Sequence, residues 1–75
     1  MTEKRIRLSD TKEVREFVRE AEKCDFDIDI SYNRVIVDAK SFLGILAMDL
    51  NQVLTVTYVG RNSNFENVLK RYAVA

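Results

Sequence analysis

Three aspartates in the middle of the chain are of the residue type that binds metal ions. Asp25, Asp27 and Asp29 alternate along one predicted strand, but they lack the loop spacing and the glycine of a calcium site. The sequence also has no histidine, a single cysteine, no glycine-rich phosphate loop and no nucleophile beside a base. We therefore expect no catalytic residue, no metal ion and no cofactor, and we do not expect an enzyme.

Two short polar side chains, Asp10 and Ser41, stand where predicted helices begin. Asp10 and Glu13 have the spacing of a capping box, with Asp in place of Ser or Thr. Ser41 precedes residues 42–48, which form a short helix that is apolar nearly all round. One face of this helix can pack on a sheet, so the other must be exposed or covered by a partner.

The composition indicates a folded chain that makes one small domain, residues 1–75, near the lower size limit for a free-standing core. Hydrophobic residues make up 47% of the sequence, and proline is absent. Twelve basic residues balance twelve acidic ones, so no net field attracts nucleic acid or an anionic membrane. The N-terminus lacks the apolar run of a signal peptide, and the lone Cys24 suits a reducing compartment. We expect a cytoplasmic protein.

Hydrophobic periodicity predicts the elements that position these side chains. Alternation predicts strands over residues 4–8, 26–31 and 35–37, and β-branched and aromatic residues predict a fourth strand over 53–59. Apolar stripes at helical spacing predict a first helix over about 11–22 and a last helix capped by Asn64. Asn33 lies in a tight turn between the second and third strands. The predicted order is β-α-β-β-α-β-α, an α+β two-layer sandwich with three helices on one face of the sheet.

One segment carries a specific resemblance. It reads Asp38-Ala39-Lys40-Ser41-Phe42-Leu43-Gly44-Ile45-Leu46-Ala47-Met48. It resembles the regulatory-serine segment of the histidine phosphocarrier (HPr) family, which reads asn/asp, small, Lys, Ser, two apolar residues, Gly, two apolar residues, small, apolar. Residues 26–28 and 32–33 also look like the second strand and hairpin of that family. The resemblance extends without a gap over residues 6–72 and implies an HPr-like sandwich with a four-stranded antiparallel sheet.

The resemblance also implies that the family's phosphotransfer site is missing. In the family, a phosphoryl-accepting histidine at the start of the first helix is followed by a small residue, Arg and Pro. Counting back from Ser41 places that lost phosphohistidine position at Asp10, the Arg at Lys12 and the Pro at Glu13. Phosphate on Asp10 as an acyl phosphate is conceivable, but an N-cap is the simpler interpretation.

The second site implied by the resemblance is retained. In Gram-positive members of the family, a serine kinase phosphorylates the serine that Ser41 matches, and an N-cap role is compatible with that modification. The family docks partner proteins through the apolar residues that follow. The predicted protein-interaction patch accordingly contains Lys12, Lys40, Phe42, Leu43 and Leu46, with Lys40 interpreted as a solvated charge.

These observations leave two hypotheses. The first is an HPr-like regulatory or adaptor protein of carbohydrate uptake or catabolite control in a bacterium, not competent for histidine phosphotransfer and switched by Ser41 phosphorylation. Its partners would be a serine kinase, a transcriptional regulator or a phosphotransferase-system (PTS) protein, with no nucleic acid and no membrane. The alternative is a diverged module without a phosphate role, such as a homodimer joined through the helix after Ser41.

Overall fold

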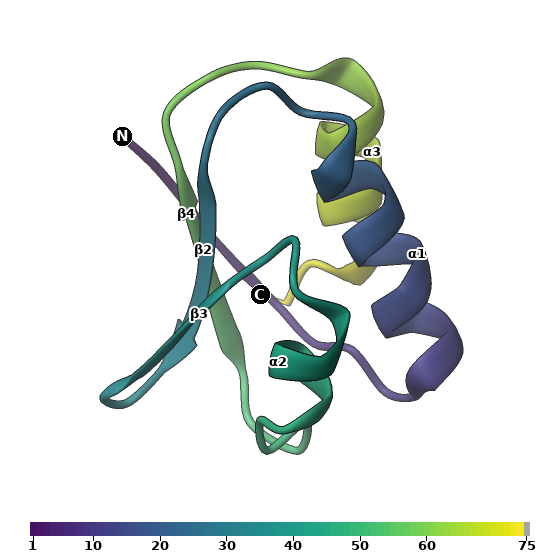
Figure 1. Cartoon of the computed structure of the whole chain (residues 1–75), viewed down its shortest axis with the longest axis vertical. Helices are drawn as coiled ribbons and strands as arrows, with labels where there is room; N and C mark the ends of the chain where they lie inside the picture. Colours follow the sequence, from purple (N-terminus) through teal and green to yellow (C-terminus); the bar gives the residue numbers. More distant parts are fainter. Residues whose placement is uncertain (75) are drawn as a thin grey trace.

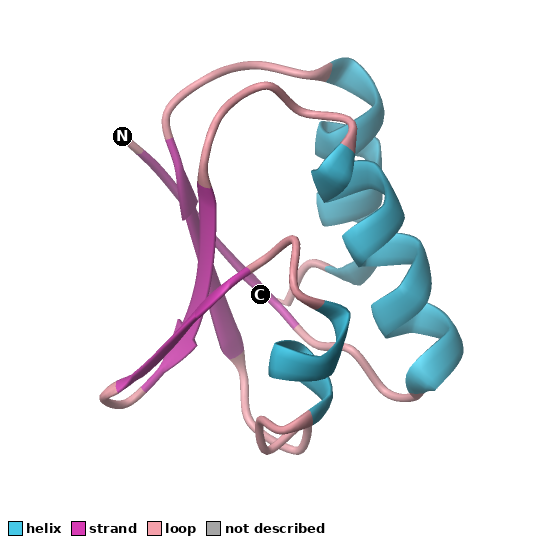
Figure 2. Ribbon diagram, viewed as in Figure 1, coloured by secondary structure: helices cyan, strands magenta, loops and turns pink. Residues whose placement is uncertain are grey.

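The computed structural model describes residues 1–74 and contains one antiparallel sheet. Its strands are β1 (Thr2–Ile6), β2 (Ile28–Tyr32), β3 (Val35–Asp38) and β4 (Leu54–Tyr58). They lie in the order β1-β4-β2-β3, so β1 and β3 are the two edges (Figure 2). Every neighbouring pair is antiparallel, which confirms the predicted sheet.

Three helices cover one face of this sheet (Figure 1). They are α1 (Thr11–Glu22), α2 (Phe42–Leu46) and α3 (Ser63–Tyr72). The element order β-α-β-β-α-β-α and the two layers confirm the predicted α+β sandwich. Among the described residues, no helix combines the length and the apolarity that crossing a bilayer requires.

The core lies between the inner face of the sheet and one stripe of each long helix. α1 buries four side chains at the predicted helical spacing, and β2 and β4 bury alternate residues, as strands with one covered face do. The largest fully buried side chains are Phe17, Phe65, Ile6, Leu8, Ile28, Ile30, Ile45, Leu54, Leu69, Val14 and Val56. Because the inner face takes nearly all the large apolar residues, the other face of the sheet is left mostly polar.

Several strand boundaries differ from the sequence predictions. β1 occupies Thr2–Ile6 rather than residues 4–8, because its pairing with β4 ends at Ile6 opposite Leu54. Leu8 is buried all the same, in the connection to α1. The second strand likewise begins at Ile28, two residues later than predicted, and continues to Tyr32.

The helix ends show similar small shifts. α2 ends at Leu46 rather than Met48, although the amide of Met48 still donates to the carbonyl of Ile45 at 3.0 Å. α3 begins at Ser63 because Asn62, rather than Asn64, is its N-cap. The side chain of Asn62 accepts from the amide of Phe65 at 3.0 Å. Local cap preferences alone could not choose between two asparagines two residues apart.

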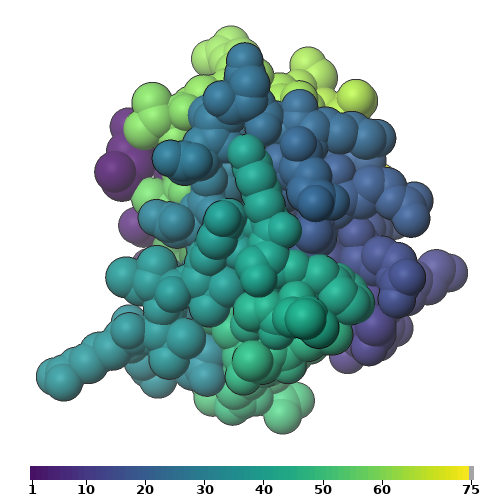
Figure 3. Space-filling view, viewed as in Figure 1, coloured from purple at the N-terminus to yellow at the C-terminus, as the bar shows by residue number. Residues whose placement is uncertain are grey.

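The β2–β3 hairpin projects from the body of the molecule (Figures 1 and 3). Tyr32 pairs with Val35, which leaves the two-residue loop Asn33-Arg34. Asn33 has a φ of 51°, in the left-handed region that a two-residue hairpin loop requires and that Asn tolerates. The prediction of a tight turn with positive φ at Asn33 is confirmed.

The two edge strands of the sheet differ in the backbone hydrogen bonds on their outer sides. Along the outer side of β1, the amide of Arg7 donates to the carbonyl of Tyr72 at 3.0 Å, and the amide of Val74 donates to the carbonyl of Arg5 at 3.1 Å. The segment after α3 therefore pairs with the end of β1. No segment of residues 1–74 pairs with the outer side of β3.

Candidate functional site

The chain enters α2 through a turn held by its own polar groups. The Oδ1 atom of Asp38 accepts from the amide of Lys40 at 2.9 Å, and the carbonyl of Asp38 accepts from the amide of Ser41 at 2.9 Å. The Oγ atom of Ser41 then accepts from the amide of Gly44 at 3.1 Å. Ser41 is thus the N-cap of α2, in extended backbone geometry with φ −100°.

Gly44 lets α2 approach the sheet closely. A Cβ atom at this position would lie 2.6 Å from Cγ1 of Val37 on β3 and 2.8 Å from the Oγ atom of Ser41. Both distances are shorter than a van der Waals contact, so any side chain here would push the helix from the strand or break the cap. The need for Gly in the segment is therefore one of packing.

Lys40 does not project freely into solvent. It is half-buried, and its Nζ atom donates to the carbonyl of Cys24 at 2.9 Å, which joins the start of α2 to the segment after α1. This corrects the interpretation of Lys40 as a solvated charge. The contact spans 16 residues and has no local signal in the sequence, which is why periodicity and capping rules did not predict it.

The apolar residues of α2 divide into a buried and an exposed set. Ile45 and Met48 are in the core, whereas Leu43 is 76% exposed. Phe42 and Leu46 are half-buried and pack against the edge of the core. We call Phe42, Leu43 and Leu46 the α2 surface. Both ends of this short helix are anchored, because the hydroxyl of Tyr32 accepts from the amide of Asp49 at 3.2 Å.

A shallow groove of about 300 Å³ lies beside Phe42, against α1. The guanidinium of Arg15 is 5.2 Å from the centre of the Phe42 ring, a cation–π distance. Val18, Arg19 and Glu22 complete the lining. The α2 surface is therefore bordered by the cationic side chains of Arg15 and Arg19 on α1.

A separate set of hydrogen bonds caps the N-terminus of α1. The Oδ1 atom of Asp10 accepts from the amide of Glu13 at 2.9 Å, and the Oε1 atom of Glu13 accepts from the amide of Ser9 at 2.6 Å. This is the predicted capping box, with the return bond made to the residue before the cap. Lys12 is exposed and forms no ion pair with any of residues 1–74.

The structure brings Phe42, Leu43, Leu46 and Lys40 together around α2, but it does not join Asp10 to them. The Phe42 ring at the start of α2 lies beside Arg15 within α1, whereas Asp10 is the N-cap of that helix. Among the described residues, Asp10 and Ser41 share no hydrogen bond.

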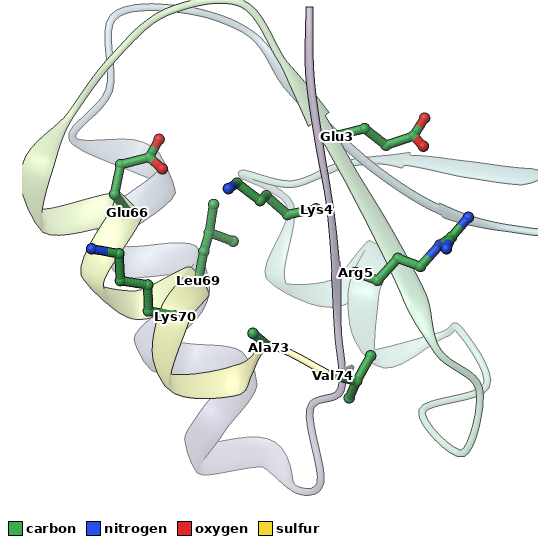
Figure 4. Close-up of a pocket in the computed structure, with 8 residues that line it drawn as sticks. All are labelled: Glu3, Lys4, Arg5, Glu66, Leu69, Lys70, Ala73 and Val74. Atoms are coloured by element: carbon green, nitrogen blue, oxygen red, sulfur yellow. The ribbon is translucent and has the colours of Figure 1, made fainter.

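Two other features lie outside this site. Cys24 is buried, and burial raises the pKa of its thiol, so the reactive thiolate is disfavoured. A hollow of about 370 Å³ lies between β1 and α3, with Lys4 and Leu69 pointing into it and Glu3 and Arg5 pointing away (Figure 4). It borders the opposite edge of the sheet from β3 and contains no residue of the predicted patch.

Comparison with known proteins supports the same fold. The crystal structure of a phosphocarrier protein HPr from Bacillus anthracis str. Ames is similar to this chain, with a TM-score of 0.70 and 26% sequence identity over 95% of each chain. No protein-family model matches the sequence. No curated protein matches it either. The chain has an HPr-like fold.

Proposed function

We propose that this chain is a regulatory or adaptor protein that binds protein partners through the α2 surface and does not carry phosphate on histidine. The observation that carries the proposal is Leu43, a large apolar side chain that is 76% exposed on a helix anchored at both ends. A rigid, exposed apolar side chain forms a contact without much loss of conformational freedom. Phe42 and Leu46 extend the same surface.

The setting of the proposal is carbohydrate uptake or catabolite control. It rests on the similarity of the fold to a phosphocarrier protein HPr and on the segment around Ser41. The 75 residues contain no histidine, so the chain has no imidazole to accept a phosphoryl group. A protein of this fold without that group can still occupy the docking surface of a partner, and we infer regulation by binding rather than by phosphate transfer.

A titration with matched variants tests the docking surface. Candidate partners are the PTS proteins and the catabolite-type transcriptional regulator of the same cell, each titrated by calorimetry. We expect Leu43→Asp to weaken binding at least about tenfold, because a carboxylate cannot be desolvated in an apolar contact. Val59→Asp is the control, since Val59 is 66% exposed on another part of the surface.

The two variants separate docking from folding. Both introduce a carboxylate at an exposed position, so both should keep the circular dichroism spectrum and the unfolding midpoint of the wild type within a small difference. Equal binding by Leu43→Asp and wild type would remove the α2 surface from the proposal. Loss of binding in both variants would place the contact elsewhere.

Phosphorylation of Ser41 is the proposed control of this docking. The Oγ atom caps the helix that carries Leu43, so a phosphate there alters the start of the docking helix itself. It would also add charge next to the turn formed by Asp38 and Lys40, where the Lys40 amine is held by the Cys24 carbonyl. We infer that the modified protein differs from the unmodified one in partner affinity.

The switch has its own test. The wild type and Ser41→Ala are incubated with the cognate serine kinase and ATP, and the products are read by mass spectrometry. We expect one phosphate on the wild type and none on the variant, although Ser9, Ser31 and Ser63 remain in both. An unmodified wild type, or equal phosphate on Ser41→Ala, would exclude the switch and leave the docking proposal to stand on the titration.

A further inference from the structure

β3 is an edge strand whose three consecutive apolar residues carry none of the charges that usually protect an edge. Charged side chains, proline, bulges or a covering segment normally block pairing with another chain. The β1 edge has charged residues at Glu3, Lys4 and Arg5 and is paired at its end by the segment after α3. In contrast, Val35, Ile36 and Val37 are all apolar and have no described neighbour on the outer side.

The register of the hairpin fixes which backbone groups of β3 face outward. Val35 and Val37 pair with Tyr32 and Ile30 of β2. In a hairpin with a two-residue loop the residues next to the loop exchange hydrogen bonds, and such pairs alternate with pairs that do not. The amide and carbonyl of Ile36 therefore point away from β2. The same alternation turns the amide of Asp38 outward.

The side chains of β3 alternate in the same way. Ile36 is 69% exposed and lies on the face of the sheet that no helix covers, opposite Ser31 of β2. Asp38, two residues after it on β3, projects to that same face because strand side chains repeat every two residues. Arg34, two residues before it, is the last residue of the hairpin loop and leads directly into the strand. Both are exposed, and Arg34 forms no ion pair with the residues that the structure describes.

The segment Arg34-Val35-Ile36-Val37-Asp38 is self-complementary. When two copies run antiparallel with Ile36 opposite Ile36, Arg34 of each copy stands opposite Asp38 of the other. Val35 of each copy then stands opposite Val37. The apolar pair at the centre is flanked on one face by two pairs of opposite charge, and cross-strand neighbours of these kinds stabilise a sheet.

We propose that the open edge of β3 is the interface of a symmetric homodimer in which two β3 strands pair antiparallel about Ile36. The outward amide and carbonyl of each Ile36 exchange two hydrogen bonds across the two-fold axis. The outward amide of each Asp38 donates to the carbonyl of the opposing Arg34. The two sheets join into one, and all helices lie on the same side of it.

Other registers of the same two strands lose this match. Shifting the axis to Val37 keeps the outward groups aligned, but it places Arg34 opposite the cationic Lys40 of the second copy. Shifting it to Val35 places Ile36 opposite Arg34, and it places Asp38 opposite Tyr32, which lies on β2 rather than on the edge. Of these three registers, only the one centred on Ile36 aligns the backbone hydrogen bonds, places apolar residues opposite each other and pairs opposite charges.

Access to this edge is open. The hairpin that carries β3 projects from the body, so a second hairpin can approach its outer side (Figure 3). α2 packs on the inner face of β3 through Gly44 and Val37, not on its outer side. The homodimer therefore differs from one joined through the α2 surface, and the two arrangements can be distinguished by experiment.

Sedimentation velocity on the full chain, from about 10 µM to about 1 mM, measures the proposed equilibrium over the range expected of a small interface. We expect a monomer–dimer equilibrium in this range. Arg34→Asp turns two attractive pairs into two repulsive ones and should raise the dissociation constant at least about tenfold. Arg61→Asp makes the same change of net charge at an exposed residue away from β3 and should stay within about twofold.

Ile36→Pro tests the backbone part of the interface. The amide of Ile36 makes no bond to β2, so proline at this edge position leaves the ladder of the monomer intact but removes the central donor of the dimer. We expect a folded monomer by circular dichroism and sedimentation. A dimer that persists in a folded Ile36→Pro variant contradicts the pairing.

A cross-link fixes the register. In a bonded antiparallel pair the two Cα atoms are about 5.5 Å apart, within reach of a short thiol-specific bifunctional cross-linker. Ile36→Cys should therefore give a covalently linked dimer with that reagent, and Leu43→Cys should not. Both variants also contain the native Cys24, which is buried, so cross-linking of the wild type measures any contribution from Cys24. A wild type that is monomeric at about 1 mM, or cross-linking only through Leu43→Cys, overturns the proposal.

Discussion

The starts of α1 and α2 use the same device in different surroundings. In each, the side chain of the N-cap accepts from the amide three residues later, Asp10 from Glu13 at 2.9 Å and Ser41 from Gly44 at 3.1 Å. Around Asp10 the contacts are local and acidic, because Glu13 returns its carboxylate to the amide of Ser9. Around Ser41 they reach across the fold.

The two helices depend on their first residues to different degrees. α1 is a long helix whose buried stripe holds it in place, so its cap adds to a helix that is already stable. α2 has five residues and depends on its neighbours: the Lys40 amine on the Cys24 carbonyl, the Gly44 backbone against Val37, and the Tyr32 hydroxyl at its end. A change at Ser41 therefore acts on the helix that carries the proposed docking surface, whereas a change at Asp10 acts on the stability of α1.

The largest expected difference between the starts of α1 and α2 is in phosphorylation. Incubated with phosphoenolpyruvate and the general PTS enzyme, the chain should take up no label, because Asp10 is engaged by the Glu13 amide and a second carboxylate repels a phosphoryl group. A histidine-containing HPr in the same reaction is the positive control. A hydroxylamine-sensitive label that disappears in Asp10→Asn would overturn the comparison.

Gly44→Ala should have the next largest effect, a loss of about 2 kcal/mol in the free energy of unfolding. The new methyl group overlaps Val37 and the Oγ atom of Ser41, and the better helix propensity of alanine offsets only part of this cost. Urea unfolding measures the loss. If the clash with Val37 is the cause, combining the change with Val37→Ala should recover part of the stability; purely additive losses would contradict that account.

Removal of either cap should cost about 1 kcal/mol. Asp10→Ala and Ser41→Ala are compared by urea unfolding, with Asp10→Asn as the control because Asn caps equally well. The comparison becomes sharper if only Ser41→Ala also lowers the affinity for a partner that binds the α2 surface. Equal effects of both variants on that affinity would mean that the two starts are not functionally distinct.

The smallest effect concerns charge alone. Glu13→Gln keeps an acceptor for the Ser9 amide but removes a negative charge near the start of α1, and it should cost about 0.5 kcal/mol at low salt. Glu22→Gln, at the other end of α1, should have the opposite sign because an anion there opposes the helix dipole. Thermal unfolding at low and high salt measures both. Effects of the same sign would show that the dipole is not the cause.

Much of the fold follows from local patterns. The apolar stripe of α1, the alternation of β2 and the turn at Asn33 each depend on residues close together in sequence. α1 and the turn lie where they were predicted, and β2 shows the predicted alternation although it begins two residues later. The end of β1 was predicted less well. It is set by pairing with β4, nearly fifty residues away, and alternation alone extends the strand to Leu8.

In the candidate site, too, local features could be predicted from the sequence and tertiary contacts could not. The exposure of Leu43 could be predicted, because a helix that is apolar all round must leave one face uncovered. The bond from Lys40 to the Cys24 carbonyl and the position of Arg15 over Phe42 could not, since each joins elements whose relative placement is a tertiary property. Residues 34–38 are self-complementary in sequence, but they can pair with a second copy only because β3 is an edge strand.

The pairing of residues 72–74 with β1 determines how many copies can join. These residues occupy the end of β1, and charged side chains line the rest of that strand, so the β1 edge disfavours a further copy and assembly through β3 stops at a closed pair. If the chain were cut after Arg71, the end of β1 would also be open to pairing. Such a molecule could add copies at both ends, as a fibre does. The short segment after α3 thus limits growth as well as completing the fold.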